Sequence, residues 1–169
     1  MRRLAIALIL AATTSAAAVA APAPRNVDLI RTFGSRLKTV RQVTTLPILL
    51  PRTMPLGGTY RLYATGEASR HSYELSLAAA RDCHGANACF IAEFDGQRGG
   101  KLPRKSNVTL AGGDPAYYHP VGCGGSCSPA SFWFTHDGVL YSTQVKDLPK
   151  GDRAILTRMA NQAIAAGPR

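Results

Sequence analysis

The sequence lacks the short motifs that accompany the common catalytic sites. Its four histidines include no H-E-x-x-H and no pair spaced i, i+4, which excludes the usual zinc-protease pattern. It has no G-x-S-x-G elbow and no G-x-x-x-x-G-K-[ST] loop, so the α/β-hydrolase nucleophile and the phosphate-binding loop are both missing. We therefore predict no catalytic residue, no metal site and no cofactor, and we favour a binding function over an enzymatic one.

Long apolar runs are also scarce, and the one that stands out lies near the N-terminus. Leu4–Ala12 is an apolar stretch of nine residues, too short for the roughly 20 that a membrane-spanning helix needs. Two arginines precede it, and Ala18-Val19-Ala20 offers small residues to a signal peptidase. Residues 1–20 are thus predicted to be a cleavable signal peptide rather than an uncleaved anchor. We expect the mature protein, residues 21–169, to be periplasmic or secreted and not membrane-spanning.

Acidic residues are few, since 10 Asp and Glu stand against 20 Lys and Arg. Removing the signal peptide with its two arginines lowers the formal net charge from +10 to +8 and leaves 149 residues, enough for one domain with its own core. A positive balance of this size favours anionic partners. The basic residues are scattered, however, and export argues against nucleic acid. The partner we expect is an anionic envelope polymer or another envelope protein.

Two amphipathic helices are predicted, one over residues 26–43 and one over residues 152–166. In each, the apolar side chains fall on one arc at 100° per residue; Asp152 is the expected N-cap of the second helix. Between residues 44 and 58, closely spaced prolines favour an extended segment, because proline removes a backbone donor and disfavours helix before it. The two apolar stripes consist of Leu29, Ile30, Phe33, Leu37 and Val40, and of Ile155, Leu156, Met159, Ala160, Ala163 and Ile164.

Residues 59–146 carry strand signals punctuated by Gly, Pro and Asp. The clearest is FWFTH-DG-VLYST, in which Asp137-Gly138 predicts a two-residue hairpin turn that places Phe134 opposite Tyr141. A helix, many consecutive strands and a second helix predict an α+β fold: an antiparallel β-sheet of about five to seven strands with both helices packed on it. The predicted strands are Tyr60–Thr65, Ser72–Ala78, Ala88–Asp95, Asn107–Ala111, Phe132–His136 and Val139–Lys146.

The four cysteines form two close pairs, Cys83 with Cys89 and Cys123 with Cys127. Cysteines in an exported domain favour disulfides, and four of them allow three connectivities. Glycines inside both loops give the backbone the freedom that small rings require, so we favour the two local bonds. Neither pair has the C-x-x-C spacing of thioredoxin-type or zinc-ribbon sites. The alternative is a periplasmic copper or thiol protein that uses the C-x-x-x-C pair and a distant histidine.

Dispersed residues leave open a second alternative, a small exported enzyme. His119 lies beside Tyr117 and Tyr118 and close in sequence to Ser126 of the second cysteine loop, so a site could assemble near the cysteine loops. The acids available for acid–base chemistry are Glu67, Glu74, Glu93 and Asp95. The last two share one face of a strand, and we interpret them as part of a solvated edge.

The single tryptophan, Trp133, points to a functional surface. In the predicted hairpin it shares a largely hydroxyl-bearing face with Leu140. Our structural interpretation is that one of the helices covers this face, because aromatic side chains are usually buried. The alternative is that Trp133 is exposed and, with Leu140, Tyr117, Tyr118 and His119, binds a glycan or a partner. The opposite face of the hairpin, predicted to be core, carries Phe132, Phe134, His136, Val139, Tyr141 and Val145.

Four segments, TLPILLPRTMP, CHGANAC, GCGGSCSPASFWFTHDGVLYSTQVK and MANQAIAAGPR, together resemble a family of small exported bacterial proteins of unknown function. The resemblance covers most of residues 40–167. Its most specific part is the pair of cysteine loops, with Cys-Gly-Ala-Asn and Cys-Gly-x-x-Cys-Ser-Pro patterns. It implies a bacterial envelope setting and local disulfides, and it transfers no catalytic or binding residue. We therefore expect an exported, non-catalytic module of the envelope or the secreted fraction.

Overall fold

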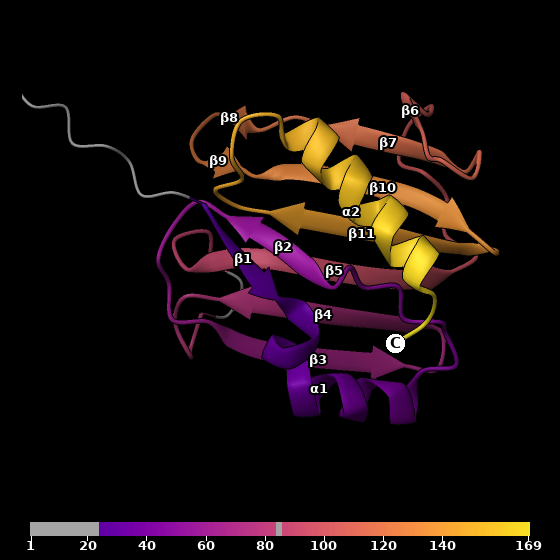
Figure 1. Cartoon of the computed structure of the whole chain (residues 1–169), viewed down its shortest axis with the longest axis horizontal. Helices are drawn as coiled ribbons and strands as arrows, with labels where there is room; N and C mark the ends of the chain where they lie inside the picture. The colour runs from indigo at the N-terminus through magenta and orange to yellow at the C-terminus, as the bar shows by residue number, and fades with distance from the viewer. Residues whose placement is uncertain (1–23, 84–85) are drawn as a thin grey trace, which may run out of the picture.

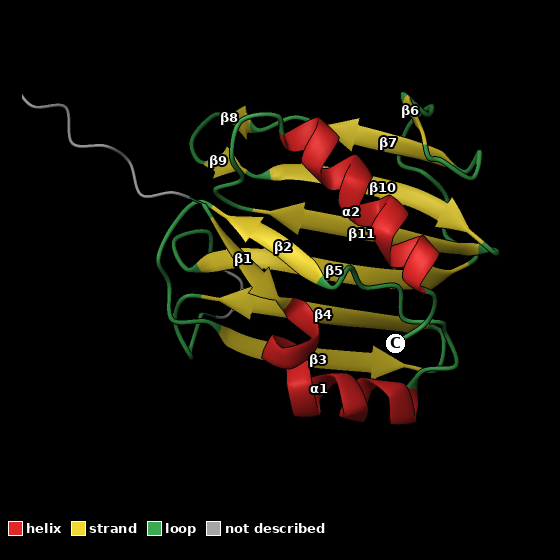
Figure 2. Cartoon of the chain, in the orientation of Figure 1, coloured by secondary structure: helices red, strands yellow, loops and turns green. Residues whose placement is uncertain are grey.

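The computed structural model describes residues 24–83 and 86–169, so the predicted signal peptide lies outside the described residues. A seven-stranded antiparallel sheet forms the centre of the fold, with strand order β3-β4-β5-β11-β10-β7-β6 (Figure 1). Together with two helices it confirms the predicted α+β class (Figure 2). The elements in chain order are β1 (Arg25–Asp28), α1 (Leu29–Val43), β2 (Thr53–Leu56), β3 (Tyr63–Ser69), β4 (Ser72–Ala78), β5 (Phe90–Arg98), β6 (Val108–Thr109), β7 (Pro115–His119), β8 (Gly122–Cys123), β9 (Cys127–Ser128), β10 (Ala130–His136), β11 (Val139–Val145) and α2 (Asp152–Ala166).

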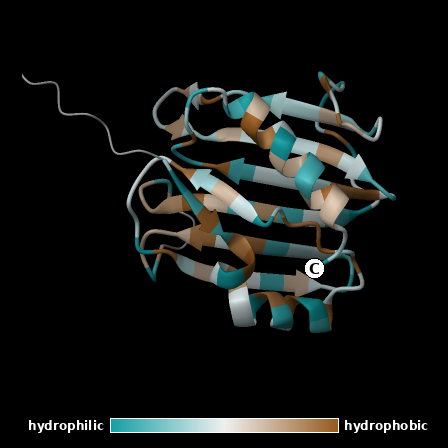
Figure 3. Cartoon of the chain, in the orientation of Figure 1, coloured by the Kyte–Doolittle hydropathy of each residue, from teal (hydrophilic) through white to brown (hydrophobic). Residues whose placement is uncertain are grey.

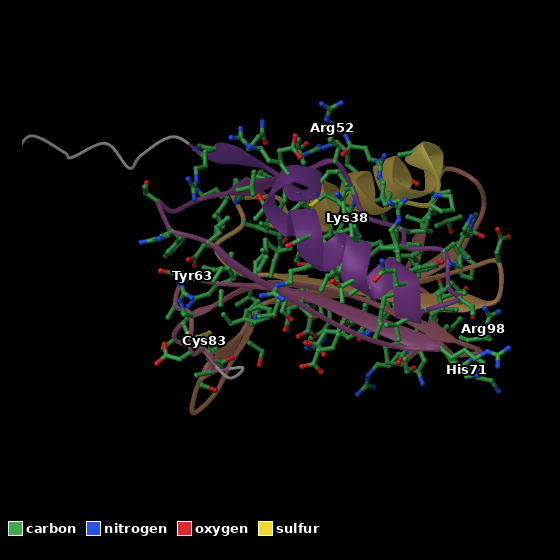
Figure 4. The ribbon with its side chains drawn as sticks, turned by 90° about the horizontal axis from the view of Figure 1, so that it is seen from below. Lys38, Arg52, Tyr63, His71, Cys83 and Arg98 are labelled. Atoms are coloured by element: carbon green, nitrogen blue, oxygen red, sulfur yellow. A yellow bond between two sulfur atoms is a disulfide. The ribbon has the colours of Figure 1, made fainter. Side chains whose placement is uncertain are left out.

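Both helices and the β1–β2 ribbon lie on one face of the sheet, here called the covered face (Figure 4). α1 runs along β3 and β4, and the ring of Phe33 meets Phe94 of β5 edge-on, with 6.1 Å between centroids. α2 crosses β10 and buries Leu156 and Met159 against the sheet. Hydrophobic and hydrophilic residues alternate along the central strands (Figure 3), as expected for a sheet with one apolar face. The buried residues that the strands contribute to this face include Tyr73, Leu75, Leu77, Phe94, Phe132, Phe134, Tyr141 and Val145.

The proline-rich connection between α1 and β2 is extended, as predicted, and it passes through the core. Ile48 and Leu50 are almost completely buried between the sheet and the helices. The hydroxyl of Tyr141 donates a hydrogen bond of 3.0 Å to the carbonyl of Pro47, and the backbone N–H of Arg169 donates one of 3.0 Å to Ile48. These bonds satisfy carbonyls that an extended buried segment would otherwise leave without partners.

The β10–β11 hairpin has the predicted register. Phe134 lies opposite Tyr141 and Thr135 opposite Leu140. Asp137 and Gly138 both have positive φ, 49° and 75°, which is the backbone that a two-residue type I′ turn requires. This turn decides which residues of both strands face the core, because a slip of one residue would exchange the two faces.

The first predicted helix begins later than expected, whereas the second has the predicted bounds but a different N-cap. The residues before Leu29 form β1 and pair with β2, so the first helix starts later than residue 26; Asp28 caps it by accepting a 3.0 Å bond from the N–H of Arg31. Gly34, with φ 42°, introduces a kink inside this helix. In α2 the N-cap is Gly151 in the left-handed conformation, and Asp152 is the first helical residue rather than the cap.

The strand predictions hold in position but differ at the ends. The Ser72–Ala78 strand is confirmed residue for residue, whereas the predicted Tyr60–Thr65 strand is Tyr63–Ser69 in the structure. Pro115–His119 is not among the predicted strands, and it forms β7, which pairs with β10. A proline at its first residue is compatible with this strand because no ladder hydrogen bond is required of it there.

Both local disulfides are present, Cys83–Cys89 and Cys123–Cys127, so the favoured connectivity is confirmed. All four cysteines of the sequence are therefore paired, so copper binding by free thiolates is not supported. Disulfides are compatible with an oxidising, extracytoplasmic location. Among the described residues, neither helix combines the length and the apolar character needed to cross a membrane.

Candidate functional site

The second face of the sheet carries polar and aromatic side chains and is here called the open face, because both described helices lie on the opposite side (Figure 4). Its residues follow from strand register, since every second residue of each strand points to this side. One row crosses six strands and consists of Tyr117, Trp133, Ser142, Asp95, Glu74 and Glu67. The neighbouring row consists of His119, Ser131, Gln144, Glu93, Ser76 and Thr65.

A groove of about 530 Å³ follows the first of these rows. Trp133 and Leu140 border it on one side, and Glu67 and Glu74 on the other, with Ser142 and Asp95 between them. At one end the loop after β5 packs on Leu140, where a Cβ added to Gly100 would lie 2.7 Å from the Leu140 Cβ. The groove also includes Ser69, Ser72 and Gln97.

An aromatic stack forms one side of the open face. Trp133 of β10 and Tyr117 of β7 are direct cross-strand neighbours, and their rings stack with 5.8 Å between centroids and 29° between planes. His119 continues the stack on Tyr117, with 6.4 Å between centroids and 27° between planes. Cross-strand aromatic pairs of this kind stabilise a sheet.

Three carboxylates gather in the middle of the open face. One oxygen each from Glu74, Glu93 and Asp95 lies within 4.8 Å of the others. The Ser142 hydroxyl donates a 2.6 Å hydrogen bond to Oδ2 of Asp95, while the buried Oδ1 of Asp95 has no hydrogen-bond partner among the described residues. Like charges at this separation disfavour full ionisation of the group.

Asp95 is the member of this cluster that retains a proton near neutral pH. Burial raises its pKa to about 7; the Ser142 hydrogen bond opposes the change, and the charges of Glu93 and Glu74 add to it. Burial also raises the pKa of Glu93, with repulsion from Glu74 as the second cause.

Four of the five predicted ligand-binding residues share the open face: Trp133, Leu140, Tyr117 and His119. Tyr118 does not, because it follows Tyr117 in a strand and therefore points to the covered side. There the Arg153 guanidinium lies 5.9 Å from its ring centroid, and burial, with Asp152, raises the pKa of Tyr118 to about 12. Tyr117 and Tyr118 therefore lie on opposite faces of the sheet and do not converge on the enzyme site considered near the cysteine loops.

The expectation that a helix covers Trp133 is wrong. Trp133 is half-buried by its sheet neighbours, and both helices pack on the other face. The apolar stripes of the helices could not reveal this, because a stripe shows that a helix packs on a sheet and not on which side. The interpretation of Glu93 and Asp95 as a solvated edge is also wrong, since β5 lies inside the sheet between β4 and β11.

Two other residues considered for chemistry lie away from the groove. His136, predicted to face the core, is half-buried beside the hairpin turn, and its Nδ1 lies 2.6 Å from Oδ2 of Asp114. Ser126 is exposed in the second disulfide loop, where its hydroxyl accepts a 3.5 Å bond from the Asn87 amide. Neither contributes to the open face as a reactive group.

Among the groove residues that the sequence analysis did not assign to a site are Ser142 and Gln97. Ser142 lies 47 residues from the Asp95 carboxylate that it contacts, and only the β5–β11 pairing brings them together. Both residues alternate with buried residues along their strands. This alternation was the sequence signal that could have placed them on the same side of the sheet as Trp133. The chain matches no protein-family model, no curated protein and no solved structure.

Proposed function

We propose that the protein is an exported binding module that holds a glycan chain without anionic groups on the open face of its sheet. The observation that carries this proposal is the Trp133–Tyr117 stack, in which Trp133 borders a 530 Å³ groove lined by carboxylates and hydroxyls and Tyr117 supports it from behind. Binding sites commonly combine an apolar or aromatic surface with a few convergent polar groups that fix orientation. The stack and the Glu74–Asp95 row supply these two components.

The polar groups of the groove suit a polyhydroxylated ligand. Glu67 and Glu74 are exposed and can accept hydrogen bonds from hydroxyl groups, and the Gln97 amide can both donate and accept. A pyranose ring has an apolar C–H face, which can pack on the exposed ring face of Trp133 while its hydroxyls reach these acceptors. Such a ligand would be placed across the strands, along the row from Trp133 to Glu67.

The charge of the open face argues for a ligand different from the anionic polymer that the composition favours. The chain carries a formal net charge of +10, yet the middle of the open face is acidic. Carboxylates at the binding surface repel an anionic chain, whereas they favour neutral or amine-bearing sugars. Export to the envelope or beyond is part of the proposal; the two disulfides and the predicted signal peptide of residues 1–20 support it.

The test uses the intrinsic fluorescence of Trp133, the single tryptophan of the sequence. We expect oligomers of N-acetylglucosamine, or their de-N-acetylated forms, to shift its emission in a saturable way, and polyglutamate of similar length to leave it unchanged. Tyr117→Ala should weaken binding at least about fivefold, since aromatic anchors commonly contribute more than about 1 kcal/mol.

The matched control is Tyr118→Ala, which removes the same ring from the opposite face of the same strand. Circular dichroism first establishes that both variants fold. Absence of a saturable shift with both kinds of oligomer would contradict the proposal, as would an equal loss of affinity in the Tyr117 and Tyr118 variants.

A second candidate function, glycoside hydrolysis, is favoured by the protonation of Asp95. Such enzymes pair a protonated carboxyl group with an ionised one, and retaining enzymes separate the two by about 5 Å. Asp95, with its pKa of about 7, and Glu74 would be the acid and the nucleophile. Release of reducing ends from the oligomers tests this activity. Hydrolysis that is abolished in Asp95→Asn would favour the enzyme. Binding without hydrolysis would favour the binding module.

A further inference from the structure

The hairpin formed by β8 and β9 projects from the end of the sheet and places its disulfide in solvent. The two strands contain two residues each, and Cys123 lies directly opposite Cys127. All residues from Val121 to Ser128 are exposed, both cysteines included. Beyond the strand pairing, two hydrogen bonds hold the hairpin tip: the N–H of Gly124 donates to the carbonyl of Ser126 at 3.0 Å, and the Asn87 amide donates to the Ser126 hydroxyl at 3.5 Å.

The other disulfide has different surroundings. Cys83 and Cys89 are half-buried, and the backbone beside them is bonded to the sheet. The N–H of Ala79 donates a 2.8 Å bond to the carbonyl of Cys89, and the Lys146 ammonium donates a 2.9 Å bond to the carbonyl of Asn87. The fold therefore supports this loop by backbone bonds to the sheet besides its disulfide, whereas the Cys123–Cys127 ring has, beyond its disulfide and strand pairing, one internal backbone bond and one long side-chain bond from Asn87.

We propose that Cys123–Cys127 is a thiol-exchange site that reacts with an external dithiol, while Cys83–Cys89 is structural. A thiolate of the dithiol bonds to the sulfur of one cysteine, and the other cysteine leaves as a thiolate and takes up a proton. The second thiol of the dithiol then attacks the mixed disulfide, so the dithiol becomes a disulfide, its two protons end on Cys123 and Cys127, and both cysteines are thiols. Exposure favours this reaction, because the attacking thiolate must reach a disulfide sulfur.

This reactivity does not depend on what the open face binds. Exposed disulfides are more often labile, regulatory or catalytic than buried ones. The glycines of the CGGSC ring allow the opened loop to relax without moving a packed side chain, since a Cβ on Gly124 or Gly125 would meet nothing within 4 Å. Reduction would thus free the hairpin tip and leave the sheet intact.

The experiment titrates the folded, oxidised protein with increasing ratios of reduced to oxidised dithiothreitol, followed by alkylation and peptide mass mapping. We expect Cys123 and Cys127 to be alkylated at a ratio at least about tenfold lower than Cys83 and Cys89, with the far-ultraviolet circular dichroism unchanged. The variant Cys83→Ser/Cys89→Ser should keep the same midpoint for the Cys123–Cys127 bond. Simultaneous reduction of both bonds, earlier reduction of Cys83–Cys89, or loss of folded structure at the Cys123–Cys127 midpoint would each overturn the proposal.

Discussion

The two faces of the sheet use alternate residues of the same strands for different purposes. On the covered face Phe94, Phe132 and Tyr141 are each at most 2 % exposed and pack against helices and the proline-rich connection. On the open face the adjacent residues, Asp95, Trp133 and Ser142, border a groove. A strand has a side-chain period of two, so one segment can supply stability on one side and recognition on the other.

The two faces also differ in what they contribute to the free energy of unfolding. Apolar burial on the covered face stabilises the fold, at roughly 25 cal/mol for each Å² removed from water. On the open face, burial of Asp95 between other carboxylates disfavours its ionised form and destabilises the fold at neutral pH. A carboxyl group that is kept at a position where it destabilises the fold points to a functional role for that position.

The largest expected effect is on the covered face. Leu156→Ala should lower the free energy of unfolding by about 2–5 kcal/mol, because Leu156 is 1 % exposed and its removal leaves a cavity under α2. Gln162→Ala, on the exposed side of the same helix, is the control and should change stability by less than about 0.5 kcal/mol. Urea unfolding measures both. A loss below about 1 kcal/mol for Leu156→Ala would mean that α2 does not depend on this packing.

The next effect is on the open face and depends on pH. The pKa of Asp95 is about 7 in the folded protein and about 3.9 in an unfolded chain. The folded state therefore binds the additional proton between these values, and the stability that protonation provides is lost as the pH rises from about 4 to 7. Asp95→Asn cannot ionise, so it should stabilise the protein by up to about 4 kcal/mol at pH 8 and by almost nothing at pH 4.

Urea unfolding of the wild type and of Asp95→Asn at the two pH values measures this difference. Gln97→Ala provides the control, because it changes the same groove without an ionisable group and should give the same change in free energy at both pH values. An Asp95→Asn effect that is equal at pH 4 and pH 8 would mean that Asp95 titrates in the folded protein as it does in the unfolded chain.

Local interactions account for what the sequence could predict. The hairpin register follows from Asp137-Gly138, the disulfides from short glycine-containing loops, and the burial of Leu156 from helical periodicity. Each of these signals is contained within a few residues of the chain, where turn chemistry and side-chain period act directly.

The arrangement of the open face could not be predicted, because it depends on pairing between strands that are far apart in the sequence. Asp95 and Ser142 meet only because β5 pairs with β11, and the strand order of a sheet is not fixed by the pattern of any one strand. The same limit explains why Trp133 was expected under a helix. The amphipathic stripes identified helices that cover a sheet, but the side that they cover follows from connections and packing across the whole chain.

A smaller effect tests the turn that assigns residues to the two faces. Gly138 has φ 75°, a conformation that costs other residues roughly 1–2 kcal/mol, so Gly138→Ala should destabilise the protein by about 1 kcal/mol. Gly124→Ala is the matched control, because a Cβ there meets nothing within 4 Å and the residue has no positive φ. Thermal unfolding of both variants measures the difference. Equal effects would show that the hairpin turn tolerates a side chain and does not by itself fix the register.

The smallest expected effect concerns Trp133. Because it is half-buried on the open face and stacked on Tyr117, its emission should be quenched by acrylamide in the folded protein, with a quenching constant between those of a buried tryptophan and of the unfolded chain. Trp133→Phe keeps an aromatic ring on Tyr117 and should change the free energy of unfolding by less than about 1 kcal/mol, the range of one cross-strand pair. The comparison with Leu156→Ala then separates the two faces directly, since a residue that serves recognition can be replaced with little loss of stability. A blue-shifted emission that resists acrylamide, or a loss of several kcal/mol in Trp133→Phe, would place Trp133 in a second core and remove the distinction between a packed face and an open one.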